Sequence, residues 1–278
     1  MERRLDFRPD TVLALDIETV PDTRLIPADW PDDKFPKLPW HKVVAISFVE
    51  ADIERSGERE RYAVTACRSG GDESYDEERL LRSFWKYFET RRPRVVTWNG
   101  RGFDLPVLRM RAMMLGISTA VWSRSGDRWQ GYNHRYSPGW HTDVMDQFSD
   151  YGAAPRMGLE DAAIALGFPG KIGGSGSGVA EMMAQGRLAD VRAYCEADAL
   201  LTFGVYAHWC HASGLAGDED HAATLNGLAR YLEEARAQRP HLGAFLDGWR
   251  IPRPRRPPRI PPPRPPPPRP ALARMALR

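Results

Sequence analysis

The stretch TVLALDIET, residues 11–19, decides the fold. Its first six residues, Thr11–Asp16, are mostly aliphatic, and so short an apolar run favours a buried strand over a helix. Side chains alternate along a strand, so Asp16 and Glu18 are expected on one face and the neighbouring aliphatic residues on the other. Two like charges side by side are costly unless protons or a cation compensate them, which points to a divalent metal. The alternative is a solvated strand end.

The following segments predict a mixed sheet flanked by helices, an α/β fold. Residues 20–40 contain five prolines and are expected to form a loop. Three strands close in sequence precede strands reached through helical crossovers. The expected elements are strands at 43–49, 61–67 and 94–98 and helices at 72–89 and 105–116.

The second half of the chain is expected to be mainly helical. Residues 118–149 are aromatic and polar without sustained periodicity, so we assign them no role. Helices are expected at 159–166, 188–212 and 222–237, with a flexible glycine-rich loop at 173–178 before residues 179–185. Trp249–Arg278 holds 12 prolines and 9 arginines and no acid, which predicts polyproline II or disorder. We therefore expect one domain over residues 1–240 and a disordered Pro/Arg-rich tail over 241–278.

Charge and cysteine content narrow the class of protein. The 278 residues have a net charge of +2, but without Trp249–Arg278 the remaining 30 basic and 37 acidic residues give −7. Three cysteines without a CxxC motif favour a reducing compartment and disfavour a thiolate zinc site. No apolar run reaches the roughly 18 residues that span a bilayer, so a cytoplasmic protein without a membrane partner is expected. The basic tail could attract nucleic acid, lack a function or be a reading-frame artefact.

Two further acids lie on other elements. Asp104 follows the strand at 94–98 and a glycine-containing turn, where a helix N-cap or an acid at the N-terminus of the helix is the simplest reading. Its position is notable because open α/β sheets place their sites at the carboxyl ends of strands. Asp198 lies within the apolar stripe of the helix at 188–212, one turn after Tyr194 on the same face. A tyrosine hydroxyl bonded to a half-buried carboxylate would also explain that pair.

The four acids Asp16, Glu18, Asp104 and Asp198 come from three separated elements, with no histidine or cysteine ligand set nearby. Oxygen ligands alone suit Mg²⁺ or Mn²⁺ and disfavour zinc. Their joint chemistry would be phosphoryl hydrolysis with two metal ions.

Three strings resemble the exonuclease motifs of the DEDD superfamily, which has an RNase H-like fold: LDIET (15–19), WNGRGFDLPVL (98–108) and YCEADALL (194–201). The Tyr194-x-x-x-Asp198 spacing is that of the tyrosine (DEDDy) subgroup. The sequence resembles the proofreading domain of family-B DNA polymerases and especially the stand-alone predicted polymerase-B-like 3′-5′ exonucleases. HTDVMD (141–146) and GKIGGSGSGV (170–179) are also similar to the stand-alone group.

The resemblance implies a 3′-5′ exonuclease that acts on single-stranded nucleic acid with a free 3′ end, DNA favoured, and releases nucleoside 5′-monophosphates. It implies that two Mg²⁺ or Mn²⁺ ions are held by the four acids and that Tyr194 orients the attacking water. A phenol with a pKa near 10 is a poor base at neutral pH, so it need only position that water. The substrate-binding residues implied are Asn99, Phe103 and Thr19; a polymerase or repair protein as partner stays open.

Two other functions remain open at this point. One is a non-catalytic nucleic-acid-binding module whose acids are structural and whose arginine-rich tail binds. The other is an endonuclease of the RNase H type with the same fold.

Overall fold

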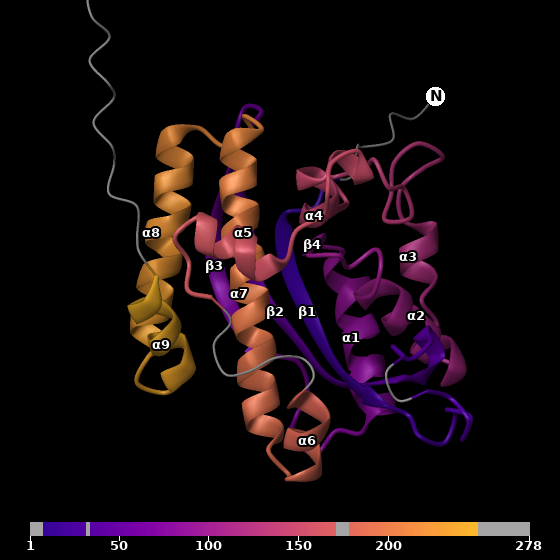
Figure 1. Cartoon of the computed structure of the whole chain (residues 1–278). Coiled ribbons are helices and arrows are strands. Elements are labelled where there is room, and N and C mark those ends of the chain that lie inside the picture. The colour runs from indigo at the N-terminus through magenta and orange to yellow at the C-terminus, as the bar shows by residue number, and fades with distance from the viewer. Residues whose placement is uncertain (1–7, 32–33, 171–177, 250–278) are drawn as a thin grey trace, which may run out of the picture.

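A five-stranded mixed sheet forms the centre of the protein (Figure 1). The computed structural model describes residues 8–31, 34–170 and 178–249. The strands are β1 (Thr11–Pro21), β2 (His41–Ser56), β3 (Arg59–Ser69), β4 (Arg94–Thr97) and β5 (His141–Asp143), in the sheet order β3-β2-β1-β4-β5. β1 pairs antiparallel with β2 and parallel with β4, β2 pairs antiparallel with β3, and β5 pairs parallel with β4. The predicted α/β fold of RNase H-like type is confirmed.

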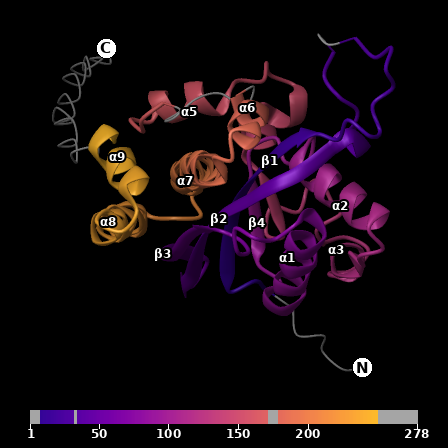
Figure 2. The ribbon, with the colours of Figure 1, turned by 90° about the horizontal axis from the view of Figure 1, so that it is seen from below.

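Helices cover both faces of this sheet. Figure 2 shows α1, α2 and α3 on one face and α5, α6 and α7 on the other, with α8 and α9 beside α7. The helices are α1 (Glu77–Arg91), α2 (Asp104–Met114), α3 (Ala120–Arg124), α4 (Val144–Phe148), α5 (Leu159–Ala165), α6 (Val179–Ala184), α7 (Leu188–Ala212), α8 (Asp218–Ala235) and α9 (Pro240–Gly248). Short 3₁₀ turns occupy Leu38–Trp40 and Asp150–Gly152. None of these described helices is long and apolar enough to span a membrane.

β1 contributes side chains to the hydrophobic cores on both faces of the sheet, as the alternation of its side chains predicts. Val12 and Ala14 belong to the core beneath α5, α7, α8 and α9. Leu13, Leu15 and Ile17 belong to the core beneath α1 and α2. Side chains at even positions of β1 therefore point toward α7, so Asp16 and Glu18 share the face of that helix.

α7 is the central helix of its layer. Every residue from Tyr194 to Ala207 is buried, whereas the sequence pattern predicted a single apolar stripe. The sheet covers one side of α7, and α5, α8 and α9 cover others. A side-chain atom on Gly204 would lie 2.4 Å from the ring of Phe168, so the chain before α6 packs directly on the helix backbone. Such close packing fixes the position of every side chain that α7 presents.

Two expectations need correction. The stretch 118–149, which has no readable period, contains α3, the edge strand β5 and α4. The boundary at residue 240 is too early, because α9 packs on α7 and α8 and buries Leu242 and Phe245 completely. The tail was assigned from composition, and Pro240 at the first position of a helix is compatible with that helix. The remainder of the predicted tail, 250–278, and most of the glycine-rich loop, 171–177, lie outside the described residues.

α9 is also tied to α7 by charge. Glu196, one of the buried residues of α7, accepts hydrogen bonds from Arg239 and from Nε2 of His241, the latter at 2.6 Å. The Ser69 hydroxyl and backbone N–H, at 2.8 and 2.7 Å, are its other partners. A carboxylate at this depth would be costly without such partners. α9 thus packs on α7 and also supplies a polar partner for its buried Glu196.

Candidate active site

A hollow of about 450 Å³ opens where β1, the turn after β4, α5 and α7 meet. Its lining includes six carboxylates and, among the residues that the structure describes, no lysine, arginine or histidine. The lining residues are Asp16, Ile17, Glu18, Trp98, Asn99, Phe103, Asp104, Gly158, Leu159, Glu160, Asp161, Tyr194 and Asp198. A concave site with such an unbalanced set of charges is the candidate active site.

β1 delivers Asp16 and Glu18 to this hollow. The register between β1 and β2 shifts immediately after Glu18, between the pairs Glu18–Ala45 and Thr19–Val43. Irregularities of this kind often lie beside active sites, because they re-aim side chains and end regular pairing. The two carboxylates therefore lie at the last regular positions of the strand.

A tight turn after β4 delivers Asn99 and Asp104. Asn99 adopts a left-handed backbone conformation, with φ +60°. A side-chain atom on Gly100 would lie 2.4 Å from Thr97, so only glycine fits there without a shift. Asp143 of β5 holds the turn by accepting hydrogen bonds from the backbone N–H groups of Asn99 and Arg101, each at 2.9 Å.

Asp104 is the first residue of α2, and the N-cap position is taken by Phe103. The N-cap role considered from sequence is therefore wrong by one position. The Asp104 carboxylate instead lies close enough to the backbone of Ile17, the residue between the two acids of β1, for that backbone group to lower its pKa. The second motif is in this way joined directly to the first.

α7 delivers Tyr194 and Asp198, which stand one turn apart and both line the hollow. Ligand oxygens of Asp16, Glu18 and Asp198 all lie within 4.8 Å of one another. Asp104 is not a member of that group of three, but its charge acts on Asp16. The structure therefore brings all four predicted acids to one hollow, three of them within reach of a single ion.

The electrostatics of the hollow reflect the crowding of negative charge. Burial, followed by the charges of Asp104, Asp198 and Glu18, raises the pKa of Asp16 well above its usual value. Burial is also the main reason that the pKa of Asp104 rises to about 7, with the charge of Asp143 next among the causes that raise it. Both shifts show that full ionisation is unfavourable here without a compensating cation.

The sulfur of Cys195 contacts Asp16 from α7. It donates toward the carboxylate oxygen Oδ2 at 3.4 Å and toward the backbone carbonyl at 3.3 Å. Burial and the charges of Asp16 and Glu18 raise the pKa of this thiol well above its usual value, so it stays protonated and can donate.

The predicted substrate-binding residues differ in their placement. Asn99 and Phe103 line the hollow, and so does Trp98, which also packs against the core beneath α7. Thr19 does not line it; its hydroxyl bonds to Nδ1 of His41 at 3.1 Å.

Sequence reasoning missed three acids. Glu160 and Asp161 line the hollow from the first turn of α5, where acids are so common for helix-dipole reasons that nothing marked them. Asp143 does not line the hollow. It lies in the HTDVMD string, which resembles the stand-alone group, but that resemblance did not indicate what Asp143 does. Its contacts with the turn became visible only with the strand order.

The fold and the hollow define the class: an α/β protein of RNase H-like type with an acid-lined pocket at the strand ends. Residues 33–249 match the family described as a predicted 3′-5′ exonuclease related to the exonuclease domain of PolB, and the chain belongs to this family. It is accordingly an enzyme of the exonuclease type with a nucleic-acid substrate, and the predicted membership of the stand-alone polymerase-B-like group is confirmed; the motif at 15–19 lies outside the matched residues. A comparison with curated proteins finds no match.

Proposed function

We propose that the protein is a metal-dependent 3′-5′ exonuclease that hydrolyses phosphodiester bonds at the 3′ end of single-stranded nucleic acid, with DNA favoured, and releases nucleoside 5′-monophosphates. The observation that carries the proposal is the hollow itself, in which six carboxylates meet without a described basic residue. A polyanionic substrate cannot approach such a surface unless cations lie between them.

The donor set fits hard divalent cations. All the candidate ligands are carboxylate oxygens, which suit Mg²⁺ and Mn²⁺ better than zinc. Two such ions, when bound, would stabilise the charges on the attacking and leaving oxygens of an in-line displacement. Asp16, Glu18 and Asp198 are close enough to hold one ion together, and Asp104 and Asp16 would contribute to the second.

The other residues of the hollow position the reactants. We assign Tyr194 the orientation of the attacking water, because its side chain stands one turn from Asp198 and lines the same hollow. Asn99 and Phe103 would contact the terminal nucleotide from the turn held by Asp143. Thr19 would act only through His41, to which its hydroxyl is bonded.

A labelled-strand assay tests the proposal. Purified full-length protein with Mg²⁺ or Mn²⁺ should shorten a 5′-labelled single strand one nucleotide at a time, and EDTA or Asp198→Asn should stop it. The shortened product and the released mononucleotide are resolved by gel and by chromatography. Matched DNA and RNA strands measure the sugar preference. A circular strand should survive, and its cleavage would instead indicate an endonuclease.

The second candidate function is a non-catalytic nucleic-acid-binding module. It predicts the opposite of the exonuclease proposal for two variants. A chain ending at Trp249 would lose binding to nucleic acid, and Asp198→Asn would bind and behave as the wild type does. Under the exonuclease proposal, the chain ending at Trp249 keeps its activity, because α9 and all the residues lining the hollow are retained.

A further inference from the structure

Three aromatic rings stand at the edge of the catalytic hollow. Phe103 lines the hollow, and its ring centroid lies 4.9 Å from that of His41 and 5.8 Å from that of Phe35. The His41 ring is fixed by Thr19 and by the carbonyl of Pro36, each at 3.1 Å. Phe35, in contrast, is 72% exposed. Phe35 thus extends the aromatic wall of the hollow into solvent, and it packs against the His41 ring, whose two nitrogens are both hydrogen-bonded.

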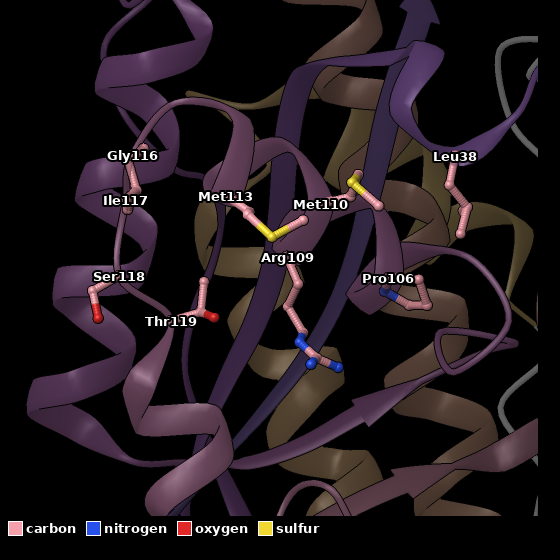
Figure 3. A pocket seen from close by; sticks show the side chains of 9 residues that line it. All are labelled: Leu38, Pro106, Arg109, Met110, Met113, Gly116, Ile117, Ser118 and Thr119. Atoms are coloured by element: carbon pink, nitrogen blue, oxygen red, sulfur yellow. The ribbon is translucent and has the colours of Figure 1, made fainter.

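A second hollow, of about 540 Å³, is lined by residues that lie close to these aromatic residues in the chain, and Figure 3 shows its lining side chains. Leu38 comes three residues after Phe35, and Pro106 three residues after Phe103, and both line it. Met110 and Met113 of α2 lie between Leu38 and Ile117 in Figure 3. The lining residues are Leu38, Pro106, Arg109, Met110, Met113, Gly116, Ile117, Ser118 and Thr119.

The polar residues of this second hollow suit a phosphate backbone. Arg109 is exposed and forms no ion pair with the part of the chain that the structure describes. Ser118 and Thr119 add hydroxyl donors, and the methionines offer adaptable apolar surface. Because residues 1–248 carry a formal charge of −7, a substrate strand needs local cations where it crosses the surface.

We propose that the single strand leaves the catalytic hollow over Phe35 and continues in the second hollow, with a base 5′ of the terminal nucleotide stacked on Phe35 and a phosphate paired with Arg109. The inference rests on the proposed function and specifies how that site holds its substrate. An exposed aromatic ring beside a cationic groove is the usual arrangement for binding single strands without sequence preference.

Binding without turnover tests the stacking step. With Ca²⁺ in place of Mg²⁺ or Mn²⁺, so that cations still lie between the carboxylates and the strand, fluorescence anisotropy with a 5′-fluorescein decathymidylate should show about tenfold weaker binding for Phe35→Ala, with Phe35→Trp close to wild type. Trp129→Ala is the matched control, since Trp129 is 70% exposed and lines neither hollow, and it should bind as the wild type does. Phe35 is so exposed that its removal should leave the unfolding midpoint unchanged.

The position of the stacked base gives a sharper result. One abasic residue is moved stepwise along the strand from the 3′ end. At one position, 5′ of the terminal nucleotide, Phe35→Ala should no longer weaken binding, because the base it would lose is already missing. An equal loss at every position, or no loss at all, overturns the stacking proposal. In that case an apolar protein segment would be the better occupant of the second hollow.

The phosphate contact has its own readout. Arg109→Ala should lower the slope of log K against log salt concentration by about 0.7, as expected for one phosphate of a single strand. Arg128→Ala, which removes a cation outside both hollows, should leave the slope unchanged. An unaltered slope for Arg109→Ala refutes the proposal that the strand continues in the second hollow.

A substrate without an upstream base separates this inference from the proposed function. The p-nitrophenyl ester of thymidine 5′-monophosphate offers only the terminal nucleotide, so its hydrolysis by the wild type with Mn²⁺ tests the catalytic hollow without the path of the upstream strand. Hydrolysis of oligonucleotides by the wild type, with equal KM for Phe35→Ala, would refute the path but leave the exonuclease intact. A wild type that cleaves neither substrate refutes both.

Discussion

The carboxylate of Asp143, at the end of β5, accepts two hydrogen bonds of 2.9 Å from the turn that begins at Asn99. Asp143 is buried and does not line the catalytic hollow. The turn that places Asp104 is therefore shaped by the neighbouring strand as well as by its own glycine.

Asp143→Ala should leave the N–H groups of Asn99 and Arg101 without their acceptor. The free energy of unfolding should fall by about 1–3 kcal/mol, the cost of partly buried groups left unpaired. Activity should fall at least tenfold, because Asp104 follows the same turn. Urea unfolding and kcat measure the two effects. Asp143→Asn retains a single acceptor oxygen, so its free energy of unfolding and its kcat should lie between those of the wild type and the alanine variant. A wild-type kcat for Asp143→Ala would contradict the positioning role.

Asp16→Asn should stabilise the metal-free protein. The substitution removes one charge from a group whose ligand oxygens lie within 4.8 Å of one another, so repulsion falls and stability should rise by about 1 kcal/mol. Thermal unfolding in EDTA measures this. Adding Mn²⁺ should stabilise the wild type, by about 2.7 kcal/mol at 100 times Kd, and this variant far less. Equal stabilisation of both would place the metal elsewhere.

The contribution of Asp104 to the stability of the metal-free protein should fall as the pH rises. The pKa of Asp104 is raised from 3.8 to about 7, so the folded state binds this proton more tightly than the unfolded state does. The resulting stabilisation is complete below about pH 3.8 and is lost as the pH passes through about 7. In EDTA, the gain in stability of Asp104→Asn over the wild type should therefore increase between pH 5 and pH 8. A parallel pH dependence would contradict the shift.

Tyr194→Phe should lower kcat while leaving metal binding intact. The variant removes one hydroxyl from the hollow and none of the carboxylates. We expect a loss of at least tenfold in kcat if the hydroxyl positions the water. The Mn²⁺-induced rise in the unfolding midpoint should match that of the wild type. An unchanged kcat would remove the role assigned to Tyr194.

Short-range patterns were enough to predict most of the fold. The alternation in β1 correctly predicted which face carries Asp16, and α7 begins and ends at its predicted residues. The patterns could not predict the lengths of strands that are stabilised by pairing. β1 continues to Pro21 because it pairs with β2 up to His41. β5 has only three residues and is held by its neighbour β4, so it carries no period of its own.

For the candidate site, sequence spacing identified acids, but proximity depended on the tertiary structure. Asp16 and Asp198 lie far apart in the chain and are brought together by the packing of α7 on β1. Glu160 and Asp161 resembled ordinary helix-start acids. Phe35 lay in a proline-rich loop that local reasoning could not place beside Phe103.

The pairing of Glu196 with Arg239 and His241 sets a limit on how the chain can be shortened for crystallisation or expression. A version cut at residue 240 would lose His241 and the apolar residues of α9, so Glu196, two positions from Asp198, would lose one partner and its cover from α9. Such a product would be expected to aggregate or to show altered metal affinity, and its inactivity would say nothing about catalysis. Shortened versions should therefore keep every residue through Trp249, whose ring stacks on Phe168 at 4.9 Å.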